Sequence, residues 1–289
     1  MSALICALIF LTIAAPVMAH GDDDHAATLS WTFDPWIVLP IAMISLLYVS
    51  GHIKLSRRSR LSGPMRWQDL FFCCGMLTLA GALISPLHWL GEHLFTFHMI
   101  EHEVVMAVSA PLIVLARPVG LLLWGLPRRA RRAIGTLTAS PSIRRAWDWC
   151  AGGGGATVIH GAAIWGWHLP FLFDAAVTST TMHRLQHLSF FVTALLFWWA
   201  VVWKSEYGTA AWHLFTTMIH TGILGALMAL SPRVLYAAQT KTASDWGLTP
   251  LEDQQLAGMI MWVPAGTIYA AAALTMTALW VGRSSKGGT

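Results

Sequence analysis

Charged residues are scarce in this chain of 289 residues and make up only 11% of it. Soluble globular domains carry about 25% charged residues, so this scarcity excludes an ordinary soluble domain. Hydrophobic residues make up 56% of the chain instead, which indicates an integral membrane protein. The basic residues lie in short loops between apolar stretches, so nucleic-acid binding is not expected.

Motifs of common enzyme classes are also missing. The four cysteines form no CxxC pair. The glycine run at 152–155 is not followed by Lys-Ser or Lys-Thr, so it is not a phosphate loop. The segment HMIEH at 98–102 has its glutamate beside the second histidine, unlike the HExxH motif of metalloproteases. We therefore predict that the protein is not an enzyme.

Seven segments are long and apolar enough to cross a bilayer as helices of about 20 residues. Backbone polar groups must be satisfied inside the bilayer, so open strands are excluded there. The predicted fold is all-α, a polytopic bundle of seven transmembrane helices. The segments are 35–53, 67–87, 95–116, 152–170, 183–203, 211–230 and 256–281.

The amino-terminal 19 residues are short, apolar and end in Val-Met-Ala, which is typical of a secretory signal peptide. Cleavage after Ala19 would make His20 the mature terminus. An uncleaved first helix is the alternative, because a basic region before the apolar stretch is missing. The predicted organisation is a signal peptide at 1–19, an extracytoplasmic His/Asp tail at 20–34, a transmembrane domain at 35–283 and a cytoplasmic tail at 284–289.

Orientation follows from the basic residues. All but three of the 18 Lys and Arg residues lie on one side of the predicted spans, the exceptions being Arg184, Arg233 and Lys241. The positive-inside rule places that side in the cytoplasm, with the mature amino terminus outside and the carboxyl terminus inside. The Arg-rich loop 117–149 is expected to lie along the anionic inner leaflet. We expect a multi-pass protein of the bacterial plasma membrane.

Two histidine pairs lie within or at the edge of these apolar spans. His98 and His102, and likewise His183 and His187, are four residues apart, so each pair shares one helix face. The predicted topology places both pairs near the outer surface. Imidazole is costly to bury in hydrocarbon without a partner. A metal, a haem, a proton path or another polar side chain could each supply that partner.

Further candidate ligands lie at the same predicted depth. His168 ends the fourth span, and Asp253 and Met261 begin the seventh. Thioether together with imidazole favours Cu(I). Asp253 could instead be favoured by the helix dipole, and Met261 by core packing. His20 and His25 in the acidic tail could bind Cu(II) through the free amine and two imidazoles, or the tail could simply be solvated.

Four segments resemble the CtaG-type assembly proteins of caa-type cytochrome c oxidases: HMIEHEVVMAVSAPLIVLARP at 98–118, WHLPFLFDAA at 167–176, HRLQH at 183–187 and DQQLAGMIMWVP at 253–264. The resemblance implies a role in maturing a haem–copper oxidase by supplying copper to its copper B centre. The family often has Gln where this chain has Glu101. The family's functional residues correspond to His98, His102, His168, His183, His187, Asp253 and Met261.

Three functions follow as hypotheses. The first is a copper-binding assembly factor, with an outer His/Met cluster that receives copper, from a periplasmic donor or the acidic tail, and passes it to the oxidase subunit carrying copper B. The second is a haem-binding or haem-handling protein with two axial histidines. The third is an assembly scaffold without cofactor. The sequence assigns no role to Glu101 or Glu103.

Overall fold

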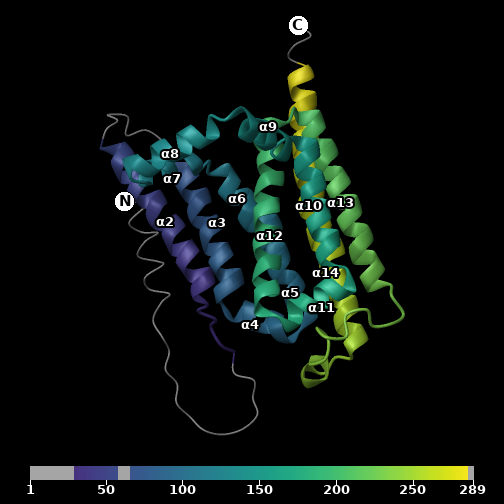
Figure 1. Cartoon of the computed structure of the whole chain (residues 1–289). Helices are drawn as coiled ribbons and strands as arrows, with labels where there is room; N and C mark the ends of the chain where they lie inside the picture. The colour runs from purple at the N-terminus through teal and green to yellow at the C-terminus, as the bar shows by residue number, and fades with distance from the viewer. Residues whose placement is uncertain (1–28, 58–65, 286–289) are drawn as a thin grey trace.

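The computed structural model describes residues 29–57 and 66–285, and these residues form helices and no strand. The long helices lie side by side, and shorter helices cross or cap the ends of the bundle (Figure 1). This confirms the predicted all-α fold. The predicted signal peptide at 1–19, with His20 and His25, falls outside the described residues.

Five helical segments in the described part of the chain are long and apolar enough to cross a membrane. Two of these segments contain a π-helical turn. The first of the two joins α5 (Phe95–Glu103), η1 (Val104–Ser109) and α6 (Ala110–Leu115). The second joins α12 (Thr180–Trp199) and η2 (Ala200–Lys204). The length and apolar composition of these helices identify the chain as a membrane protein. The remaining three are α2 (Pro35–Ser56), α3 (Arg66–Ile84, apolar from Trp67) and α14 (Pro250–Ser284).

The other two predicted spans are helical but do not belong to this set of five. α13 (Tyr207–Ala229) has 23 residues, and α10 (Gly153–Trp167) has only 15. α10 is shorter than the predicted 152–170 because Pro170 begins a separate helix, α11 (Pro170–Thr178). A proline disfavours helical backbone in the residue before it. The count of seven spans therefore remains a prediction.

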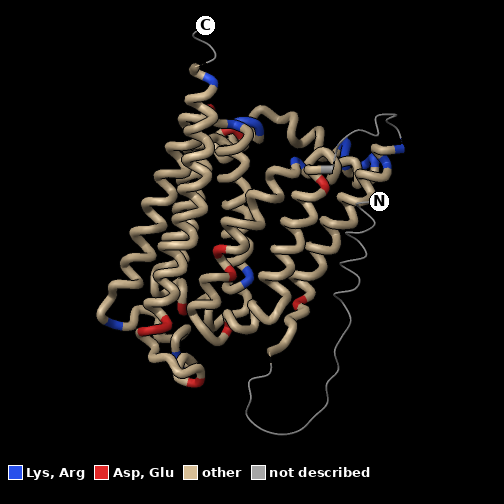
Figure 2. Tube along the Cα trace, turned by 180° about the vertical axis from the view of Figure 1, so that it is seen from behind, with Lys and Arg blue, Asp and Glu red and all other residues tan. Residues whose placement is uncertain are grey.

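Two short helices, α8 (Arg128–Thr138) and α9 (Pro141–Cys150), run across one end of the bundle after α7 (Val119–Gly125) (Figure 1). Lys and Arg residues gather at this end, which we call the basic end (Figure 2). Neither helix contains a buried residue, and Leu137 and Trp147 are at least half exposed. The predicted Arg-rich loop is thus helical, with apolar and basic side chains both exposed.

Indole hydrogen bonds tie the helix formed by α12 and η2 to the helix that carries the first histidine pair, which is formed by α5, η1 and α6. The Nε1–H of Trp198 donates to the carbonyl of Met106 at 2.9 Å, and that of Trp203 donates to the carbonyl of Val114 at 3.0 Å. Met106 lies in the π-helical turn η1. A π-helical turn disturbs the regular bonding of the helix, and polar backbone in an apolar bundle needs such partners. These bonds hold in place the two elements that carry the histidine pairs.

Candidate metal centre

Three helices bring five histidine rings together at the end of the bundle opposite the basic end. α4 (Pro86–His93) contributes one ring, and α5 and α12 contribute two each (Figure 1). Neighbouring ring centroids lie 4.2 to 6.1 Å apart. The two predicted pairs therefore do meet. We call these five residues the histidine cluster: His88, His98, His102, His183 and His187.

α4 begins immediately after α3 and points its first turn at the cluster. Ser85 caps the helix by accepting a hydrogen bond from the backbone N–H of Leu87, and Pro86 occupies the first helical position. Proline suits this position because its φ is helical and no N–H is needed there. The break between α3 and α4 thereby places His88, 4% exposed, at the level of the two pairs.

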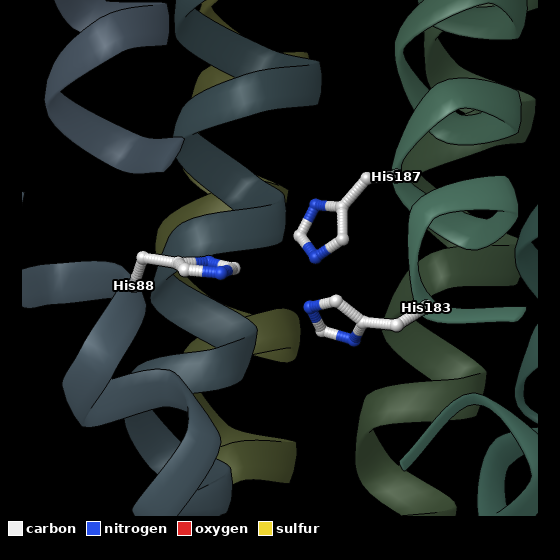
Figure 3. Close-up of side chains that lie close together, drawn as sticks. All are labelled: His88, His183 and His187. Carbon is white, nitrogen blue, oxygen red and sulfur yellow. The ribbon is translucent and has the colours of Figure 1, made fainter. Parts of the chain in front are cut away.

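Among the described residues, His88, His183 and His187 form a compact group of potential ligands. One ring nitrogen from each lies within 4.8 Å of those of the other two, and the rings face a common space (Figure 3). We call these three residues the histidine triad. Three imidazoles that converge in this way can coordinate one metal ion.

Glu101 supports the triad from α5. The Nδ1–H of His88 donates to Glu101 Oε1 at 2.7 Å, and the same oxygen lies 3.8 Å from His187 Nε2. Metal-binding histidines usually donate their second N–H to a carboxylate or a carbonyl, which leaves the other nitrogen free for the metal. Oε2 of Glu101 is buried without a hydrogen bond. The carboxylate sits against Gly91, where an added Cβ would lie 2.9 Å from Oε2.

The charge around His88 is negative. Burial alone lowers the pKa of His88, but the hydrogen bond to Glu101 and the negative charge of Glu101 outweigh it and raise the pKa. Glu92 and Asp34 act in the same direction with smaller effects. This part of the site therefore stabilises positive charge.

His98 and His102 lie one helical turn apart on α5 and contact each other directly. Their Nε2 atoms are 2.8 Å apart, so one ring donates an N–H to the other. Both residues are almost fully buried, at 2% and 1% exposed. The His102 ring also lies 4.7 Å from that of His187. The pair is thus in direct contact with the triad and adds two further imidazoles to it.

Several nitrogens of the cluster are buried without a hydrogen bond. They include both ring nitrogens of His187, Nε2 of His183 and Nδ1 of His102. Buried polar atoms are normally paired, and an unpaired one calls for a missing water or ion. Such a concentration of bare imidazole nitrogens is suited to a bound cation.

His168 lies near the cluster but outside its ring contacts. Its ring lies 6.0 Å from that of Phe173 and 6.3 Å from that of Phe190. These phenyl rings in turn contact His98 and His102. Nδ1 of His168 donates to the carbonyl of Ile164, and its Nε2 is buried without a partner. Phe173 and Phe190 thus each contact both His168 and a ring of the histidine cluster.

Asp253 and Met261 both lie in α14, and the structure gives their surroundings. Both carboxylate oxygens of Asp253 accept hydrogen bonds from the start of α5, from the N–H of Phe95 at 2.8 Å and from the N–H and hydroxyl of Thr96 at 3.0 and 2.7 Å. Met261 is 1% exposed within the apolar core. Asp253 thus caps the start of α5. Met261 packs in the apolar core.

His88 is the residue that sequence reasoning missed. It directly follows the predicted second span 67–87, so it has no partner at helical spacing and was not part of a pair. Topology offered one usable signal: the end of the second span and the beginning of the third must lie at the same side of the membrane. His88 and His98 are therefore at matching depth.

Comparison with known proteins identifies the family. Residues 46–283 match the model of the family described as "cytochrome c oxidase caa3 assembly factor" (Caa3_CtaG). Two relatives, the uncharacterised proteins Mb0105 of Mycobacterium bovis and MT0111 of Mycobacterium tuberculosis, are each 27% identical over 253 residues. The match covers 80% of this chain but only 36% of each relative, so the chain spans about a third of their length. No solved structure matches. The chain belongs to the cytochrome c oxidase caa3 assembly factor family.

Proposed function

We propose that this oxidase assembly factor binds a copper ion as cargo at the histidine triad and passes it to the copper B centre of its oxidase. The observation that carries the proposal is the convergence of His88, His183 and His187, with ligand atoms within 4.8 Å of one another. Imidazole ligands suit copper, zinc, iron and nickel. A haem–copper oxidase needs copper and haem iron, so these are the relevant cargoes for this family.

The packing of the rings favours a bare ion over a haem. Two histidines that ligate a haem need room for the macrocycle between them. His98 and His183 lie 5.7 Å apart between ring centroids, and His102 and His187 lie 4.7 Å apart. His88 packs against the same rings. A haem would therefore have to separate rings that are already in contact.

The side of the membrane also fits copper delivery. The cluster lies at the end opposite the basic end (Figures 1 and 2). Under the positive-inside rule, the basic end faces the cytoplasm and the cluster faces outward. We propose this orientation, with seven spans and a cleaved signal peptide, for a bacterial plasma-membrane protein. Copper would then reach the site from the extracytoplasmic side.

Metal analysis and an absorption spectrum on one purified sample test the proposal. The full-length protein, loaded with Cu(I) and desalted, is expected to retain about one copper and to show no Soret band. The His183→Ala/His187→Ala double variant should lose the copper. His213→Ala is the matched control, because His213 hydrogen-bonds Thr157 on α10 rather than joining the cluster.

Three outcomes contradict the proposal. Copper retained by the double variant would reject the triad as the site. A Soret band without added haem would favour the haem function. If the double variant lost copper but still supported full oxidase assembly in cells, the protein would act as a scaffold, and copper would not be its cargo.

A further inference from the structure

A partly exposed carboxylate on α4, that of Glu92, lies one helical turn from His88 of the buried histidine triad. Glu92 follows His88 by four residues, so both lie on one face of this short helix. The side chain of Glu92 is 50% exposed, whereas that of His88 is 5% exposed. Oε1 of Glu92 lies 3.9 Å from Nε2 of His88. The exposed carboxylate therefore adjoins the nitrogen that His88 leaves free for a metal.

This separation suits a shared cation. Metal bonds to imidazole nitrogen and carboxylate oxygen are each about 2 Å long. One ion could therefore bind both Glu92 Oε1 and His88 Nε2 with little movement of either side chain. The opposite side of the His88 ring is fixed by its hydrogen bond to Glu101, so the ring does not need to reorient to accept the ion.

The nearby cation Arg184 does not oppose such an approach. Its Nε donates to Asp34 Oδ2 at 2.8 Å, and the pair is partly exposed. Arg184 adjoins His183 in sequence, so an unpaired guanidinium there would repel an incoming cation. Asp34 offsets that charge and leaves Glu92 and Glu101 as the negative groups beside His88.

We propose that Glu92 is the entry ligand of the site. Its carboxylate binds the cation from water and passes it to His88 Nε2. The transfer is a ligand exchange in which the ion gains the bond to nitrogen and then loses the bond to oxygen and its remaining waters. The proposal rests on the proposed function, because it needs a cation that binds the triad. It adds the route by which that cation arrives and predicts a kinetic role for Glu92.

The test compares association rates with binding stoichiometry. Full-length protein in an uncharged detergent is mixed with Cu(I) in a stopped-flow instrument without oxygen, and quenching of tryptophan fluorescence reports binding. Glu92→Gln is expected to slow association about fivefold at low salt, since a negative charge beside the site raises the encounter rate with a cation. At 1 M salt, where the Debye length is about 3 Å, the difference should shrink to about twofold or less. The stoichiometry should not change.

Asp245→Asn is the matched control. Asp245 is an exposed carboxylate in η3 (Ala243–Trp246), and that loop packs beside α4 through Trp246 and Trp89. This variant removes the same charge and is expected to associate at the wild-type rate. Equal rates for Glu92→Gln and wild type at low salt would overturn the proposal. Equal slowing in both variants would also overturn it, because general surface charge would then explain the effect. Absence of Cu(I) binding in the wild type would instead reject the proposed function.

Discussion

The carboxylate of Glu101 is predicted to strengthen metal binding without ligating the ion. The perturbation is Glu101→Gln, which keeps the size of the side chain and a carbonyl acceptor for His88 but removes the charge. The fixed hydrogen bond of 2.7 Å between His88 Nδ1 and Glu101 Oε1 lets the effect be worked out.

The magnitude follows from distance. An ion on His88 Nε2 lies about 6 Å from Glu101 Oε1, given a metal–nitrogen bond of about 2 Å on the far side of the ring. Two unit charges at that distance interact by about 2.8 kcal/mol at an effective dielectric constant of about 20. Removing the hydrogen-bonding partner of a metal-binding histidine typically costs about 10–100-fold in metal affinity. Since about 1.4 kcal/mol is a factor of ten, the charge alone accounts for a loss of about 100-fold at most. We therefore expect Glu101→Gln to weaken copper binding about 10–100-fold, and Glu101→Ala, which also removes the acceptor, to weaken it more than Glu101→Gln does.

Competition with a copper chelator of known affinity measures both variants. The dissociation constant should rise in the order wild type, Gln, Ala, while the stoichiometry at saturation stays at about one. Wild-type affinity in Glu101→Gln would refute the electrostatic reasoning. Loss of saturable binding in Glu101→Gln would also refute it, because that would make the carboxylate a direct ligand.

Three further substitutions test the surrounding structure. Gly91→Ala should weaken copper binding in a chelator assay and lower the melting temperature, since its Cβ would lie 2.9 Å from Glu101 Oε2. Gly81→Ala is the control and should leave both properties near wild type, because the space around Gly81 is open. Asp253→Ala should cost about 1–3 kcal/mol of stability because buried N–H groups lose their acceptor, and its copper content should stay unchanged if the residue is only a cap. His88→Ala should lose bound copper in metal analysis, and retained copper would show that the two sequence-predicted pairs suffice.

The histidine pairs could be predicted because their geometry is local. A spacing of four residues puts two rings on one helix face whatever the fold, and charge bias then places both pairs at one end of the bundle. Ring centroids of 4.7 Å between His102 and His187 confirm that the pairs meet. The same reasoning could not say how many ions or which nitrogens are involved, because that depends on how the helices are turned toward one another.

Residues whose role depends on distant contacts could not be assigned from the sequence. Asp253 begins α14, and its carboxylate caps α5 across 158 residues of chain. The sequence assigned no role to Glu101, because that role depends on His88, which enters the site through the break between α3 and α4. The length of α10 was overestimated for a local reason, since Pro170 starts a new helix at the end of the apolar stretch.

The surplus of imidazoles provides a route by which the proposed copper cargo would leave. One ion needs about four ligands, and the cluster offers five rings, so His98 and His102 can displace triad ligands one at a time. Each exchange keeps the coordination nearly complete, which lowers the barrier to release compared with simple dissociation. The His98→Ala/His102→Ala variant is therefore expected to bind about one copper but to transfer it more slowly to a chelator added in excess. Timed transfer from the loaded protein measures this, with His213→Ala as control. A variant that transfers copper as fast as wild type would refute the exchange mechanism, and one that cannot bind copper would place the binding site at His98 and His102 instead of at the triad.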